Sequence, residues 1–345
     1  MMLRCYIFDL SMSTKSSECR RRSRICAIFP GALGDFICFL PALQALARTG
    51  VVDLFARSEF AELTPESVQV QSIESSFIGR CFRTEPVESD DDARRFRAYD
   101  AVYSWFASAN QDFRRRFQAL AGGKVRFFPF RPAQGANHQA DYYLDCVEQR
   151  ADDSILPLVT IRPDALRWCE SFWFENSLAQ RGVLTIAPGS GAREKNWSAL
   201  FFGAVAQWWR ETVGGAVVAL IGPVERERGG LDPLRSDCIV ADGLSLSQAA
   251  ALLSRCNLYL GNDSGISHLA AATGTRTVTL FGPSNPRQWA PRGKNAVVLR
   301  RHLACSPCAE PVMKSCPHHA CLTEFFPDEI IATLARLPEV ITLTR

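Results

Sequence analysis

The fold of this chain is decided by residues 258–283, which read LYLGNDSGISHLAAATGTRTVTLFGP. The apolar run at 258–260 predicts a short strand, which ends in a turn of glycine and N-cap residue types. Small residues at 266–273 predict a helix that ends at Gly274, since helices often close on a left-handed residue. The β-branched and apolar residues at 277–281 predict a second strand. The stretch is therefore a βαβ unit, which indicates a parallel sheet.

The polar turn between this strand and its helix is a candidate binding site. Ligands of open parallel sheets lie at the carboxyl ends of the strands, where Asp263, Ser264, Gly265 and His268 fall. Free N–H groups at a helix start, a hydroxyl group and a glycine suit a phosphate. A capped helix whose histidine hydrogen-bonds a backbone carbonyl explains the same residues without a ligand. The turn alone leaves both interpretations open.

The composition bounds the class of protein. The 345 residues are enough for two domains, and 47% hydrophobic with 22% charged residues is typical of a globular protein. The net charge of +3 does not indicate nucleic-acid binding. No apolar run is long enough to span a bilayer, and the first ten residues do not resemble a signal peptide. Single cysteines within apolar runs predict buried thiols, so we expect a cytoplasmic protein.

A second βαβ unit opens the N-terminal half. Residues 25–29 and 51–55 predict strands, and residues 36–48 predict an apolar helix between them. Asp35 therefore falls at the end of the first strand, where the helix begins. A helix N-terminus favours the ionised carboxylate, which at this edge can act as a general base. An aspartate that only caps its own helix is the alternative.

The middle of the chain has weaker periodicity. Strands are predicted at 101–106 and 124–128. Three consecutive arginines at 114–116 point in different directions on a helix, so they form a solvated face or contact a phosphorylated acceptor. Arg131 is a second candidate contact for an anionic acceptor. Prolines and acidic residues at 152–163 place a domain boundary there.

Strands and helices also alternate in the C-terminal half. Strands are predicted at 184–187, 217–221 and 238–241, a turn at 222–227, and a helix at 246–256. The same alternation in both halves predicts an α/β protein with two doubly wound, Rossmann-like domains. We expect a ligand cleft between these domains.

A glycine-containing turn follows the strand at 184–187. Ser190 and Gly191 lie in this turn, which suits a phosphate, and Lys195 follows it. A lysine at this place can neutralise a diphosphate leaving group. An ordinary surface lysine is the alternative. The functional interpretation gains from Ser264 and His268, which are predicted at a strand end of the same sheet.

Four cysteines near the C-terminus form a separate group. Cys305, Cys308, Cys316 and Cys321 have two, seven and four residues between them. Four thiols suit a small zinc site, but this spacing matches no common zinc finger. Free thiols or a redox-labile loop are the alternative.

Three segments together resemble glycosyltransferase family 9, the lipopolysaccharide heptosyltransferases. They are GALGDFICFLPAL at 31–43, APGSG at 187–191 with KNW at 195–197, and NDSGISHLAAA at 262–272 with FGP at 281–283. The cysteine-bearing tail also looks like one seen in many members. The resemblance extends from residue 25 to residue 337 and is weakest in the middle, at 58–161.

The resemblance implies a GT-B fold, in which two Rossmann-like domains face each other across a cleft. The expected parts are a disordered extension at 1–24, an acceptor-binding domain at 25–160, a donor-binding domain at 161–326, and a C-terminal helix and tail at 327–345. It further implies an inverting transfer that needs neither metal nor cofactor. The default donor is ADP-heptose, and the default acceptor is the lipid A inner core at the cytoplasmic membrane face.

The resemblance also implies roles for single residues. Asp35 would deprotonate the acceptor hydroxyl, and Asp263 would contact the donor sugar. Glu225 would bind the nucleotide ribose, a role for which Glu227 fits nearly as well. The diphosphate would be held by Ser190, Gly191, Lys195, Ser264, Gly265 and His268. Two other functions stay open, namely a nucleotide-sugar epimerase or hydrolase of the same fold and a non-enzymatic nucleotide-sugar-binding protein.

Overall fold

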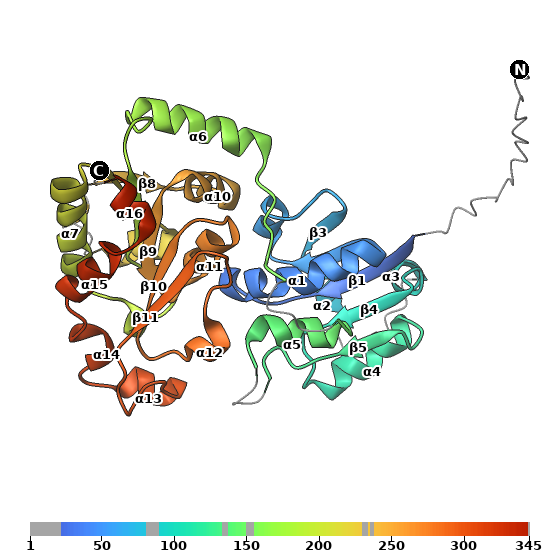
Figure 1. Cartoon of the computed structure of the whole chain (residues 1–345). Coiled ribbons are helices and arrows are strands. Elements are labelled where there is room, and N and C mark those ends of the chain that lie inside the picture. The colour runs from blue at the N-terminus through green and yellow to red at the C-terminus, as the bar shows by residue number, and fades with distance from the viewer. Residues whose placement is uncertain are drawn as a thin grey trace, which may run out of the picture.

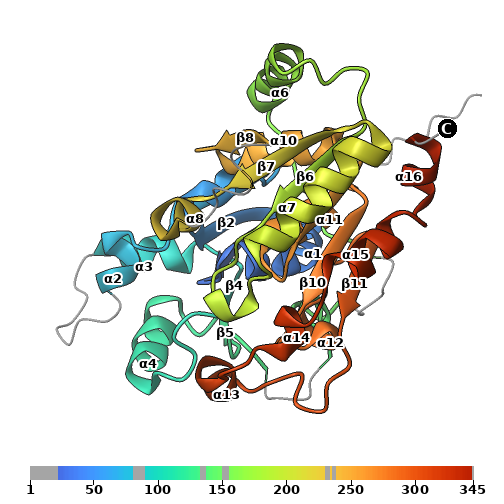
Figure 2. The same cartoon turned by 90° about the vertical axis from the view of Figure 1, so that its left-hand side faces the viewer.

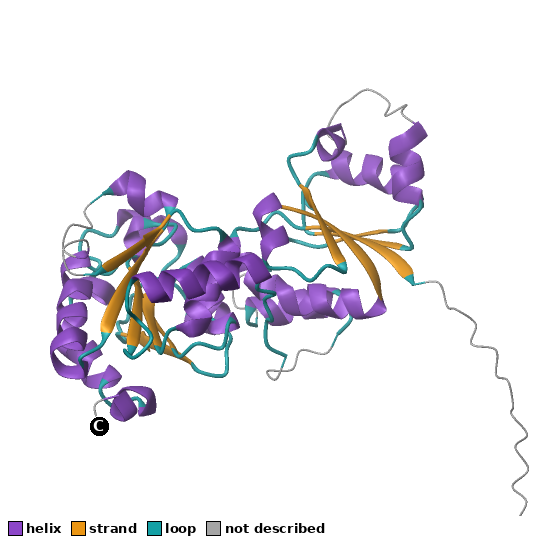
Figure 3. Cartoon of the chain, turned by 90° about the horizontal axis from the view of Figure 1, so that it is seen from above, coloured by secondary structure: helices purple, strands orange, loops and turns teal. Residues whose placement is uncertain are grey.

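The chain forms two α/β domains in the computed structural model (Figure 1). The structure describes residues 22–80, 90–132, 137–149, 155–229, 234 and 238–343. Most of the extension predicted at 1–24 lies outside the described residues, although the first strand already begins at Ser23. Seen from above, the two sheets stand apart and helices lie between them (Figure 3).

The N-terminal domain is built on a parallel sheet in the order β3-β2-β1-β4-β5. The strands are β1 (Ser23–Ile28), β2 (Gly50–Ala56), β3 (Val68–Ser72), β4 (Ala101–Ser104) and β5 (Val125–Phe127). The helices are α1 (Leu33–Thr49), η1 (Ser58–Glu62), α2 (Ser76–Arg80), α3 (Asp90–Arg97), α4 (Gln111–Leu120) and α5 (Gln139–Cys146). The strands predicted in this half are confirmed. We missed β3, an edge strand whose two valines alternate with polar residues.

The C-terminal domain has a parallel sheet in the order β11-β10-β9-β6-β7-β8. Its strands are β6 (Val183–Ala187), β7 (Ala216–Ile221), β8 (Ile239–Asp242), β9 (Leu258–Asn262), β10 (Thr277–Phe281) and β11 (Ala296–Arg300). Its longer helices are α6 (Pro163–Glu175), α7 (Ala199–Trp208), α10 (Leu246–Arg255), α11 (Gly265–Ala272) and α15 (Pro327–Leu334). Its shorter helices are η2 (Arg193–Lys195), η3 (Trp209–Val213), α8 (Pro223–Arg228), α12 (Pro286–Trp289), α13 (Glu310–Ser315), α14 (Ala320–Thr323) and α16 (Pro338–Leu343). Figure 2 shows α7 lying across the strands of this domain.

Two local predictions in this domain have definite outcomes. The turn predicted at 222–227 is wrong, because α8 forms there with Pro223 in its first turn and the Glu225 carboxylate accepting the Gly222 N–H at 3.0 Å. The organising βαβ unit is confirmed as β9, α11 and β10, and Gly274 has the left-handed φ of +87° expected after the helix.

The order of the strands places the N-termini of two helices at the switch points of the two sheets. In the N-terminal sheet β1 lies between β2 and β4, and in the C-terminal sheet β6 lies between β7 and β9. The chain therefore reverses its direction of travel at β1 and at β6, and such switch points open a crevice at the carboxyl ends of the strands. Helix α1 follows β1 and helix α11 follows β9, so both helices begin at these crevices.

Helix α1 packs at the boundary between the two domains. It packs against α5 within its own domain and against α11 of the other domain. Its aromatic side chains are fully buried, with the Phe29 and Phe39 rings stacked at 4.3 Å and the Phe36 and Phe60 rings at 4.0 Å. Aromatic pairs of this kind add to the free energy gained by burial, so the start of α1 has little freedom to move. In the described part of the chain, no helix has the length and apolar character needed to cross a membrane.

Candidate active site

A cavity of about 450 Å³ lies between the domains, at the N-termini of α1 and α11. Its wall includes Ala32, Gly34 and Arg131 of the N-terminal domain and Trp289 and Cys308 of the C-terminal domain. Most of the predicted site residues line it as well, namely Asp35, Gly191, Lys195, Asp263, Ser264, Gly265 and His268. Ser190 and Glu225 are not among the lining residues. The tertiary structure thus brings together residues from three distant segments of the sequence.

Asp35 both caps its helix and faces the cavity. Its Oδ2 accepts the Ala32 N–H at 3.3 Å, and its Oδ1 lies 3.4 Å from Arg131 Nη2. Burial raises the pKa of the Asp35 carboxyl above its ordinary value, and the Arg131 guanidinium opposes that shift. A carboxylate with a raised pKa is a stronger proton acceptor. The capping interpretation is therefore correct for one oxygen, while the other oxygen lies beside Arg131 at the cavity.

Arg131 reaches across the domain boundary. Its guanidinium lies 5.1 Å from the centre of the Trp289 ring and 5.3 Å from that of the Phe130 ring. Trp289 belongs to α12 of the C-terminal domain, so this contact joins the two walls of the cavity beside Asp35. We missed Trp289. The sequence signal for Trp289 was its place shortly after the strand predicted at 277–281, at the carboxyl edge of the sheet.

Lys195 and Asp263 form an ion pair inside the cavity. Lys195 Nζ lies 2.7 Å from Asp263 Oδ2, with side chains 29% and 7% exposed. Asn262 holds the two turns together, since its Nδ2 donates to the Pro188 carbonyl at 2.7 Å and its Oδ1 accepts the Trp197 N–H at 2.9 Å. Because Asn262 is completely buried, these two hydrogen bonds hold the turn that carries Lys195 against the carboxyl end of β9.

Ser190 and Glu225 contact the loops beside the cavity. Ser190 is buried, and its Oγ lies 2.6 Å from Asn196 Oδ1. Glu225, the cap of α8, packs on the turn after β6, where a Cβ at Gly189 would lie 1.7 Å from Glu225 Oε1. These contacts shape the turn that carries Gly191. A diphosphate contact of Ser190 and a ribose contact of Glu225 stay predictions.

His268 is buried one turn into α11. Burial lowers the pKa of its imidazole to about 4, so the ring is neutral at neutral pH. The N-cap residue Ser264 makes no side-chain capping bond to the first N–H groups of α11. Partial positive charge at this helix end and the ammonium of Lys195 make this wall of the cavity suited to an anion.

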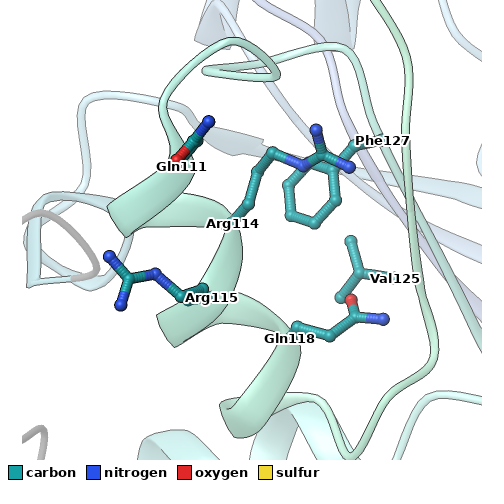
Figure 4. Close-up of a pocket in the computed structure, with 6 residues that line it drawn as sticks. All are labelled: Gln111, Arg114, Arg115, Gln118, Val125 and Phe127. Carbon is teal, nitrogen blue, oxygen red and sulfur yellow. The ribbon is translucent and has the colours of Figure 1, made fainter.

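A second groove, of about 470 Å³, lies on the outside of the N-terminal domain at α4 (Figure 4). It is lined by Gln111, Arg114, Arg115, Gln118, Val125 and Phe127. The Arg114 guanidinium covers the Phe127 ring at 5.3 Å, and Arg115 pairs with Asp112. None of the other predicted site residues lines this groove, so the arginines predicted at 114–116 are not part of the cavity between the domains.

The cysteine-bearing tail forms part of the cavity wall. Cys308 lines it, and its backbone N–H donates to the Pro283 carbonyl at 2.8 Å. Cys305, Cys308, Cys316 and Cys321 are free thiols. Within the described ranges, no three His, Cys, Asp or Glu side chains are grouped as metal ligands would be.

The sequence matches a known family over more than half of its length. The model of "Glycosyltransferase family 9 (heptosyltransferase)" matches residues 130–317. The chain belongs to glycosyltransferase family 9. A curated relative, lipooligosaccharide heptosyltransferase 2 of Campylobacter jejuni, is 29% identical over 46% of this chain and 52% of its own length. The chain thus spans about half the length of this curated relative.

Solved structures of similar proteins agree with the GT-B fold expected for glycosyltransferase family 9. The Escherichia coli ADP-heptose lipopolysaccharide heptosyltransferase II has a TM-score of 0.69 at 18% identity, covering 92% of this chain and 99% of that one. The E. coli heptosyltransferase WaaC, solved with ADP, has a TM-score of 0.59 at 16% identity, covering 90% and 98%. The prediction of two Rossmann-like domains is confirmed.

Proposed function

We propose that this member of glycosyltransferase family 9 moves a heptose from ADP-heptose to a lipopolysaccharide core or related glycan acceptor. The reaction inverts the anomeric centre, needs no metal ion, and takes place at the cytoplasmic face of the membrane. One observation carries the proposal: Asp35 of the N-terminal domain lines the same cavity as Lys195, His268 and the α11 N-terminus of the C-terminal domain. A base and an anion site in one cavity are what a single displacement needs.

In the proposed reaction, the residues of the two domains have different roles. Asp35 takes the proton of the acceptor hydroxyl as its oxygen forms a bond to the anomeric carbon of the donor. The bond from that carbon to the diphosphate oxygen breaks, and ADP leaves with the electron pair. Lys195 and the N-terminus of α11 stabilise the charge on the departing diphosphate. Attack from the side opposite the leaving group inverts the configuration.

The comparisons support the choice of donor. Family members of known structure are described as an ADP-heptose heptosyltransferase and as a heptosyltransferase with ADP. Because of these descriptions, we take ADP-heptose as the first donor to test. The ion pair with Asp263 holds the Lys195 ammonium in the cavity, and we expect Asp263 to contact the donor sugar.

The test is a transfer assay with purified protein, ADP-heptose and a lipid A core acceptor. We expect product with an inverted anomeric centre, with or without EDTA. Because a general base contributes about 100- to 10,000-fold, Asp35→Ala is expected to lower turnover by that factor while ADP binds as in the wild type. Loss of activity in EDTA would refute the metal-free mechanism, and unchanged turnover in Asp35→Ala would remove Asp35 as the base. Product formed without an acceptor would favour an epimerase or hydrolase.

A further inference from the structure

A thiol of the N-terminal domain meets the only histidine side chain that lines the cavity within the described residues. Cys38 lies in α1 and is 3% exposed, and His268 lies in α11 and is 4% exposed. Cys38 Sγ is 3.7 Å from His268 Nδ1, although the two residues are 230 positions apart in the sequence. This contact crosses the boundary between the domains.

The helices approach closely because two glycines lie between them. A Cβ built at Gly265 would lie 2.9 Å from Leu33 Cβ and 3.0 Å from the Gly34 nitrogen. A Cβ built at Gly34 would lie 3.3 Å from His268 Cδ2 and 3.7 Å from its Nε2. The Cδ2–Nε2 edge of the imidazole is therefore beside Gly34, which lines the cavity, and the Nδ1 atom faces Cys38.

The direction of the hydrogen bond follows from the chemistry of the two groups. Burial raises the pKa of the Cys38 thiol far above its ordinary value, so the sulfur keeps its proton. The neutral imidazole of His268 carries one proton, on either Nδ1 or Nε2. An imidazole nitrogen is a better acceptor than a thiol sulfur, so the S–H group donates to Nδ1. The imidazole proton is then on Nε2.

We propose that Cys38 is a positioning residue that holds the proton of His268 on Nε2, where it faces the donor's diphosphate. With the proton on Nδ1 instead, the Nε2 lone pair would face the negatively charged oxygens and repel them. Because Cys38 belongs to the acceptor-side domain, the anion site of the donor domain is complete only when α1 and α11 are packed together. This inference rests on the proposed diphosphate contact of His268.

The first experiment determines the tautomer by heteronuclear NMR of the full chain with labelled histidine. The sequence has five histidines, and His268→Gln assigns the resonances of the one in question. We expect the wild type and Cys38→Ser to carry the proton on Nε2, since a serine hydroxyl also donates. Cys38→Ala is expected to show a mixture of tautomers. A proton on Nδ1 in the wild type, or an unchanged tautomer in Cys38→Ala, would overturn the inference.

The second experiment measures ADP binding by calorimetry. We expect affinity about two-fold lower in Cys38→Ala, because a mixture of tautomers leaves about half of the molecules with the proton on Nε2, and near wild type in Cys38→Ser. Cys256→Ala is the matched control, since this buried thiol donates to the Leu253 carbonyl and does not line the cavity. In a His268→Gln background, Cys38→Ala should not lower ADP affinity further, because the glutamine amide group donates a hydrogen bond without depending on a tautomer.

These outcomes separate the inference from the proposed function. Equal loss of ADP affinity in Cys38→Ala and Cys256→Ala would reduce Cys38 to a packing residue and refute the inference. A wild-type protein that binds no ADP would refute the proposed donor, while the NMR result would still decide whether Cys38 sets the tautomer of His268.

Discussion

The ion pair between Asp141 and Arg292 should control how firmly the two domains hold together. Asp141 lies in α5 of the N-terminal domain, and Arg292 follows α12 of the C-terminal domain. Two contacts of 2.6 Å join Arg292 Nη1 to Asp141 Oδ1 and Nη2 to Oδ2, and both side chains are 13% exposed. Beside them, His138 Nε2 donates to the Ala290 carbonyl at 2.8 Å. A bidentate pair of this kind is among the stronger polar contacts in proteins.

The burial of the pair sets the size of the expected effect. Removing one partner of a fully buried pair costs about 3–5 kcal/mol, because the other charge is left without compensation. Both side chains keep some exposure, so we expect a smaller coupling, about 2 kcal/mol. A change of that size shifts the ratio of joined to separated domains about 30-fold. Since the cavity needs both walls, kcat/KM should fall by up to that factor, and most strongly if the joined form is only slightly favoured in the wild type.

The assay is a double-mutant cycle with Asp141→Asn, Arg292→Met and the double variant, measured by Tm and by kcat/KM. We expect the double variant to lose no more than the worse single variant. The control is Arg126→Met, which breaks the Arg126–Glu148 pair of 2.6 Å within the N-terminal domain, with side chains 49% and 74% exposed. Such an exposed pair should contribute at most about 1 kcal/mol. Additive effects of the two interdomain substitutions, or an equal loss in the control, would refute the reasoning.

Three further predictions concern the walls of the cavity. Because the Arg131 guanidinium lowers the pKa of Asp35, Arg131→Gln should move the acid limb of the kcat/KM profile to higher pH, and an unmoved limb would mean that the contact is absent in solution. Burial raises the pKa of Asp35 above its unfolded value, so the stability that this group contributes is present at low pH and lost as the pH rises through its folded pKa. Asp35→Asn should therefore raise Tm at neutral pH but not below about pH 4, and a Tm gain that is independent of pH would contradict this cause. Gly265→Ala should cost about 1–3 kcal/mol of stability and lower turnover, because its Cβ would lie 2.9 Å from Leu33 Cβ. Gly79→Ala in α2, whose Cβ would meet nothing within 4 Å, should leave turnover unchanged and should not lower stability, because alanine favours a helix more than glycine does.

The sequence by itself determined the alternation of strands and helices and the residue types at the strand ends. The βαβ unit at 258–283 could be predicted because hydrophobic periodicity and turn chemistry act over a few neighbouring residues. The same local signals placed Asp35, Lys195 and His268 at helix or strand ends, where the structure has them. They failed at 222–227, where Pro223 starts a short helix.

Only the tertiary structure decided which of these ends meet. The order of the strands puts β1 and β6 at the switch points, and no local pattern encodes that order. Contacts such as Cys38–His268 and Asp141–Arg292 join residues 230 and 151 positions apart. They form when two packed domains bring their surfaces together, so their geometry depends on the whole fold and not on the neighbouring sequence.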